Sequence, residues 1–141
     1  MKKISLLSVF LLVLAFTLSL KAQQKPVEND AAFSSQKIES SLTGGKTYNV
    51  TVSFKNTGEK TWRKGEYWII YTDPRMNARN NNMWGIDSIK VKRNVKPGKT
   101  YDFKFKVTAP VDPGTYFFAW QMADKNGTFG LGSGLKEIQV K

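Results

Sequence analysis

Residues 47–62 read TYNVTVSFKNTGEKTW, and the first nine of them alternate between polar and apolar side chains. The apolar members are Tyr48, Val50, Val52 and Phe54. A period of two over this length is typical of a strand that lies half-buried in an antiparallel sheet. The Asn-Thr-Gly sequence that follows indicates a turn. The stretch therefore predicts a protein built from β-strands.

Other parts of the chain carry the same signal. Two runs alternate like the first, one is rich in aromatic and β-branched residues, and polar turns separate them. The predicted strands are residues 32–38, 47–56, 67–71, 88–93, 100–107 and 115–123, with a last strand around Ile138 and Val140. About seven short strands with regular turns predict an all-β, immunoglobulin-like antiparallel sandwich, and a barrel is the alternative.

Inward-facing aromatic residues predict the core. Trp62 follows a turn beside a sheet edge, and apolar residues surround Trp120, so both are expected to be buried. The predicted core residues are Phe54, Trp62, Phe103, Phe105, Phe118 and Trp120. Trp68 and Trp84 fit either the core or a surface platform that stacks on a ligand.

The first 22 residues have the layout of a secretory signal peptide: a basic start, an apolar stretch over 6–20, and Ala22 before a polar segment. The apolar stretch is shorter than the roughly 20 residues of a membrane span, and an uncleaved anchor is the alternative. We therefore expect a signal peptide over 1–22, a flexible segment over 23–30 and one domain over 31–141. Such a chain would be exported to the bacterial periplasm or the cell exterior, with no membrane span after cleavage.

The chain has no His and no Cys. This composition excludes Ser-His and Cys-His catalysis, zinc sites of the usual ligand type and a lipid attached to an N-terminal cysteine. The carboxylates are scattered singly over turns and outer faces, so no acid–base pair is indicated. We expect no catalytic activity, metal or cofactor, and a hydrolase is the weakest alternative.

The sequence is basic, with 22 Lys and Arg residues against 11 Asp and Glu residues. Loss of Lys2, Lys3 and Lys21 with the signal leaves 19 against 11, a net charge of +8. Several lysines occupy outward strand positions, where they keep sheet edges soluble or form a surface for an anionic polymer. They are Lys55, Lys90, Lys92, Lys104 and Lys106. Nucleic acid is not expected, because the chain is exported and carries no recognition module.

Residues 73–82 read DPRMNARNNN, which predicts a long polar loop between two strands. Loops on a rigid scaffold often carry binding residues, although a merely solvated loop is the alternative. The candidate partner-binding residues are Arg75, Asn77, Arg79, Asn80, Asn82 and Trp84, together with Trp68.

From about Asp30 to Val140 the motifs follow a known order: AAFSSQKI, GKTYNVTVSFKNTGEKTW, MWGI, VKPGKTYDFKFKVTAPVDPGTYFFAWQM and FG. This order resembles the FW, or four-tryptophan, domain, the Ig-like central domain type of the autophagy receptor encoded next to the breast-cancer gene. That pattern has a Trp just before the FG, where this chain has Thr128, and Trp68 is the extra tryptophan.

The resemblance implies a sandwich that binds proteins and does no chemistry. The sequence therefore predicts a non-catalytic, exported binding module for an unknown protein partner in the periplasm or at the cell surface. The alternative is a module that binds carbohydrate or an anionic envelope polymer through exposed aromatic residues and the lysines.

Overall fold

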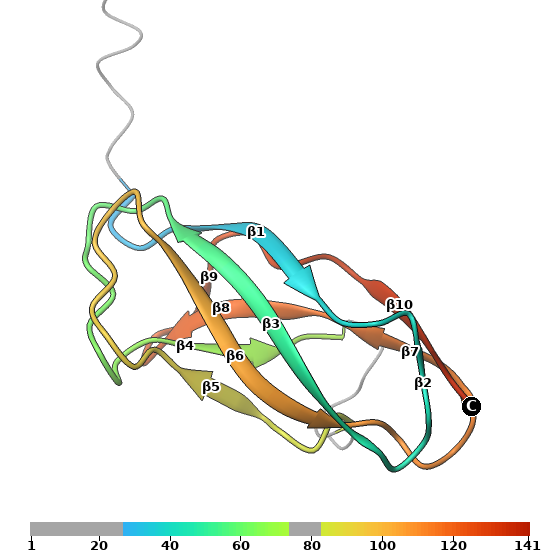
Figure 1. The fold of residues 1–141 in the computed structure, drawn as a ribbon. Helices are drawn as coiled ribbons and strands as arrows, with labels where there is room; N and C mark the ends of the chain where they lie inside the picture. The colour runs from blue at the N-terminus through green and yellow to red at the C-terminus, as the bar shows by residue number, and fades with distance from the viewer. Residues whose placement is uncertain (1–26, 74–82) are drawn as a thin grey trace, which may run out of the picture.

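The computed structural model describes residues 27–73 and 83–141, and these residues form ten strands and no helix (Figure 1). In that part of the chain there is accordingly no helix long and apolar enough to cross a membrane. The strands are β1 (Ala31–Lys37), β2 (Ser41–Leu42), β3 (Thr47–Asn56), β4 (Trp68–Tyr71), β5 (Ser88–Lys90), β6 (Thr100–Thr108), β7 (Gly114–Phe118), β8 (Trp120–Asp124), β9 (Gly127–Phe129) and β10 (Lys136–Val140).

The strands form two layers. One layer is the sheet β1-β3-β6, and the other contains the sheets β5-β4-β8-β9 and β2-β10-β7 (Figure 1). All neighbouring strands run antiparallel except β2 and β10, which pair in parallel. The side chains between the layers form a single buried cluster. This arrangement is the predicted immunoglobulin-like sandwich rather than a barrel.

Strand β3 covers the residues that the alternation predicts. Its register with β6 places Val50 opposite Phe105 and Val52 opposite Phe103, so the apolar faces of both strands point the same way. Both valines are buried. The outward positions of β3 are polar, because a period of two sends every second residue to the other face.

The aromatic residues expected in the core lie between the layers. Phe54, Trp62, Phe103, Phe118 and Trp120 are at most 1% exposed. Phe105 is half-buried, and its ring meets the edge of the Trp120 ring across the sandwich, with 5.0 Å between centroids. The two layers are therefore joined by aromatic contacts, whose edge-to-face geometry is favourable.

The prediction of one strand over residues 115–123 is wrong, because the ladder breaks at Ala119. β7 pairs with β10, whereas β8 pairs with β4 and β9. The neighbouring segment of the chain interrupts the ladder: residues 130–135, between β9 and β10, belong to no strand. Ser133 takes the place of a strand neighbour there: its Oγ accepts a hydrogen bond from Trp120 N, and its N–H donates one to Trp120 O. This division raises the strand count above seven.

The strand predicted over 88–93 is shorter, because regular pairing with β4 ends at Lys90. Val91 still donates its N–H to Tyr67 O, and its side chain is buried. The chain then turns so that Val95 forms an isolated antiparallel bridge with Trp62.

The turn after β3 is fixed by Asn56, which is 0% exposed. Its Nδ2 donates to Lys60 O at 2.8 Å and to Val95 O at 2.9 Å. Its Oδ1 accepts a bond from Gly58 N at 3.1 Å. One side chain thereby satisfies three backbone groups where the chain reverses, as buried polar groups require.

Residues 27–30 lie within the segment expected to be flexible, and the structure places them against the domain. Their backbone accepts bonds from Thr57, Glu59 and Lys60. Glu28 also forms an ion pair with Lys60, with 2.6 Å between Nζ and Oε2, which raises the pKa of that lysine. The signal peptide and residues 23–26 lie outside the described residues.

Candidate functional site

The outer face of the sheet β5-β4-β8-β9 carries an aromatic residue that the core does not use. On β4 the side chains alternate: Ile69 points inward and is fully buried, whereas Trp68 and Ile70 point outward and are half-buried. Across the sheet, Trp68 pairs with Ala123 and with Lys90. On the outer face of the sheet, the two cross-strand neighbours of Trp68 are therefore one small residue and one charged residue.

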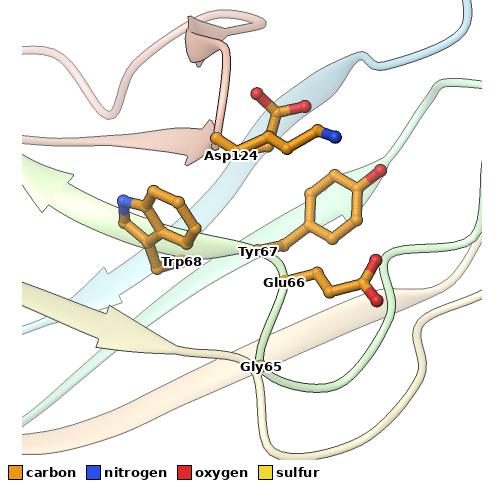
Figure 2. Close-up of a pocket in the computed structure, with 6 residues that line it drawn as sticks. Gly65, Glu66, Tyr67, Trp68 and Asp124 are labelled. Carbon is orange, nitrogen blue, oxygen red and sulfur yellow. The ribbon is translucent and has the colours of Figure 1, made fainter.

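An open depression of 460 Å³ lies beside Trp68. It is formed where the turn before β4 meets the hairpin between β8 and β9 (Figure 2). Its lining residues are Gly65, Glu66, Tyr67, Trp68, Asp124 and Lys125. Figure 2 shows the rings of Trp68 and Tyr67 side by side beneath the Asp124 carboxylate, with Glu66 on the other side of Tyr67. We call this set of residues the Trp68 pocket.

Tyr67 joins the Trp68 pocket to the core. Its ring stacks on Trp62 at 6.4 Å between centroids and meets the edge of Phe129 at 5.9 Å. Its hydroxyl donates to Asn29 Oδ1 at 3.0 Å. Burial raises the pKa of the Tyr67 phenol, and the negative charge of Asp124 raises it further. The ring contacts and the hydrogen bond fix the phenol as a wall of the depression.

Asp124 is held in place by two hydrogen bonds. Asn29 Nδ2 donates to one carboxylate oxygen at 2.8 Å, and Asn126 N donates to the other at 2.8 Å. The second bond closes the two-residue hairpin in which Asp124 pairs with Gly127. The two bonds hold the carboxylate in one orientation at the edge of the depression.

Trp84 does not form a surface platform, because the structure buries it to 1% exposure. Its Nε1 donates to Phe117 O at 3.0 Å, and its ring meets the edges of Phe118 at 5.4 Å and Tyr116 at 6.4 Å. The apolar neighbours Met83 and Ile86 pack against the same cluster. The apolar residues on both sides of Trp84 are the feature of the sequence that could have indicated its burial. Trp84 is thus a core residue at the return of the loop.

The other candidates from the polar loop, Arg75, Asn77, Arg79, Asn80 and Asn82, lie outside the described residues. Of the residues predicted to bind a partner, only Trp68 is both described and accessible. The residues around it were not recognised from the sequence, because Glu66 and Asp124 are far apart along the chain. The Asp-Lys-Asn-Gly hairpin signal at 124–127 locates one half of the depression but does not reveal its partner.

The outward lysines do not form one face. Lys55, Lys104 and Lys106 lie on the outer face of the β1-β3-β6 sheet, whereas Lys90 lies on the outer face of the opposite layer. Lys92 follows β5 and is exposed. A single surface containing all five lysines is therefore ruled out by the two-layer architecture.

The carboxylates of the described residues do not gather into a group that could bind a metal: no three Asp or Glu side chains come together in 27–73 or 83–141. The Trp68 pocket offers an indole, a phenol, two carboxylates and one ammonium group. These groups suit noncovalent contacts with a polar and aromatic surface. They include no nucleophile paired with a base.

The sequence comparison identifies the family. The family model described as the Ig-like domain from next to BRCA1 gene matches residues 35–140. The chain belongs to this family, as the order of its motifs predicted. No curated protein matches the chain.

A comparison with solved structures found, among others, a structure described as a novel β-glucosidase, EmGH1, from Erythrobacter marinus. The two chains are 14% identical, the TM-score is 0.44, and the match covers 80% of this chain but only 16% of that one. The chain therefore spans a small fraction of the length of this structural relative.

The structure relates Trp68 to the position where the FW pattern has another tryptophan. Trp68 pairs with Ala123, and Ala123 pairs with Thr128 on β9. Directly paired residues share a face of the sheet, so all three side chains lie in one outward row. Trp68 and Thr128 are thus two strands apart, about 10 Å, on the same surface.

Proposed function

We propose that this chain is an exported, non-catalytic binding module that holds a protein partner in the periplasm or at the cell surface, through the Trp68 face. This face consists of the outward residues Trp68 and Ile70 together with the Trp68 pocket. The observation that supports it most strongly is an outward indole that the core does not need, set beside an open depression.

The composition of the face fits a protein interface. Protein interfaces combine an apolar, aromatic centre with a polar rim, and tryptophan is enriched among the residues that dominate binding. Here Trp68 and Ile70 form the centre, while Glu66, Asp124 and Lys125 provide a rim of both signs. Support for export comes from the signal-like residues 1–22.

The row from Trp68 to Thr128 supplies a second argument. If the FW pattern keeps an indole on this face for binding, its position can move along the row without leaving the surface. In this chain Thr128 is exposed, and Trp68 supplies the aromatic ring instead. The proposal therefore predicts that an indole at either position serves the same surface.

The test is capture of envelope proteins at high salt by the wild type and by Trp68→Ala, followed by affinity measurements on the protein retained. Removal of a dominant interface residue weakens binding by about 2 kcal/mol or more, roughly 30-fold. Val111, which is 80% exposed in a turn between β6 and β7, gives the matched control Val111→Ala. Equal affinity of Trp68→Ala and the control for the retained protein would contradict the proposal.

A rescue variant tests whether binding requires an indole anywhere in this row or requires Trp68 itself. Trp68→Ala combined with Thr128→Trp is expected to recover at least part of the affinity, because it returns an indole to the same row. Arg75→Ala with Arg79→Ala tests the prediction for the polar loop independently, and a loss there would assign the partner to the loop instead.

A further inference from the structure

The outer face of the opposite layer contains a groove of 410 Å³ across the sheet β1-β3-β6. Its exposed outward residues are Lys37 on β1, Asn49 on β3, and Lys104 and Lys106 on β6, with Thr51 half-buried between them. We call these five residues the lysine groove. It lies on a different layer from the Trp68 pocket, so the two sites are independent.

The strand register fixes the arrangement of the charges. Lys37 pairs with Thr51, and Thr51 pairs with Lys104, so one row across the sheet places a lysine on each side of a hydroxyl. The next outward pair joins Asn49 to Lys106. Neighbouring strands lie about 4.8 Å apart and alternate residues about 6.8 Å apart. The three ammonium groups therefore originate from backbone positions about 7–12 Å from one another.

The positive charge in the groove is not neutralised locally. No carboxylate of the described residues lies within ion-pair distance of the three lysines. The outward positions of β1, β3 and β6 include one carboxylate, Asp102, and its Oδ1 accepts a bond from Ser53 Oγ at 2.7 Å. The groove thus faces solvent with three cations, an amide and a hydroxyl.

From this geometry we propose that the lysine groove is a binding site for an acidic polysaccharide, a linear glycan that carries carboxylate groups. Such a chain presents anions for the three lysines and hydroxyls for Asn49 and Thr51. The charge complementarity selects an anionic ligand.

The lining favours a glycan over an acidic polypeptide. The outward residues of the groove include no aromatic or large aliphatic side chain, and such anchors dominate protein interfaces. Val50 and Phe105 also line the groove, but the register directs their side chains to the core. The floor strand β3 is hydrogen-bonded on both sides, so a peptide cannot add to it as a further strand. The contacts offered along the floor of the groove therefore come from side chains.

The experiment uses calorimetric titration of the purified chain with oligogalacturonate, a carboxylated glycan, at low and high salt. The test variant combines Lys37→Gln, Lys104→Gln and Lys106→Gln. The control combines Lys90→Gln, Lys92→Gln and Lys96→Gln, which lowers the net charge equally at other places. All six lysines are exposed, so thermal unfolding is expected to stay within a few degrees of the wild type.

We expect binding that weakens at least tenfold at high salt, because exposed charges are screened. The groove variant should lose about tenfold in affinity and the control less than twofold. Oligoglutamate of equal charge should bind at least tenfold more weakly than the glycan. Trp68→Ala should leave glycan binding unchanged, which separates this test from that of the protein-binding face.

Three results would overturn the proposal. Equal losses in the two triple variants would mean that net charge governs the association. Oligoglutamate binding as tightly as the glycan would make the groove a surface for acidic peptides. Absence of binding to the carboxylated glycan at low salt would remove the site altogether.

Discussion

Replacement of Asn56 by Ala tests how the turn after β3 is held. The substitution removes three hydrogen bonds, to Lys60 O, Val95 O and Gly58 N. Val95 O keeps a second bond from Trp62 N at 2.9 Å, so its loss is partial. The buried N–H of Gly58 loses the acceptor that the turn provides, and an unsatisfied buried group costs about 1–3 kcal/mol.

Together the three losses should lower the free energy of unfolding by about 2–4 kcal/mol. This is a large part of the roughly 5–15 kcal/mol that stabilises a domain. The assay is equilibrium unfolding in urea, read as a shift of the midpoint at an unchanged slope. An unchanged slope means that the unfolded state has not been altered.

Asn94 provides the matched control, because it is exposed and its Oδ1 accepts one bond from Lys64 N at 2.9 Å. Asn94→Ala should cost less than about 1 kcal/mol, since water replaces the lost donor. Asn56→Asp should be at least as damaging as Asn56→Ala at pH 7, because a carboxylate oxygen would face two carbonyls. If Asn56→Ala and Asn94→Ala unfold at the same urea concentration, the claim that the buried hydrogen bonds of Asn56 stabilise this turn is refuted.

Three further changes are predicted. Trp84→Ala should destabilise the fold by about 3–5 kcal/mol in urea unfolding, as expected for a buried aromatic residue, and a change below 1 kcal/mol would contradict its place in the core. Gly130→Ala should be severely destabilising, because the φ of Gly130 is +67° and the added Cβ would lie 2.5 Å from Ala31 O. The control is Gly134→Ala, where φ is +71° but the space around the residue is open. It should cost only about 1 kcal/mol in the same assay. The fold raises the pKa of Tyr67, so the stabilisation that comes from its neutral phenol is fully present below about pH 10 and is lost as pH rises through the folded pKa. Tyr67→Phe lacks this titrating group, so its free energy of unfolding should fall less than that of the wild type between pH 8 and pH 11. Equal falls would contradict the raised pKa.

The elements that the sequence predicts well are those in which local pattern and tertiary environment agree. β3 spans the predicted residues because its inward positions are apolar and its outward positions are polar over its first nine residues. The break between β7 and β8 could not be predicted in this way. Residues 115–123 are largely apolar on both faces, and the interruption comes from the partner segment 130–135, where Ser133 replaces a strand neighbour.

The candidate site was predictable only in part. The aromatic run at 67–71 drew attention to Trp68, but its outward direction depends on the register that buries Ile69. The depression brings together residues 65–68 and 124–125, and no local pattern links these two turns. Similarly, Lys37 joins Lys104 in one row only because β3 lies between their strands.

The central claim is that the Trp68 face is the surface that holds a protein partner. Hydrogen–deuterium exchange of the chain with and without the protein retained at high salt tests it most directly, because bound surfaces exchange more slowly. The account predicts added protection in peptides covering residues 65–71 and 120–129, and little change in β1 and β6. Protection confined to β1 and β6, with the peptides around Trp68 unchanged, would contradict it.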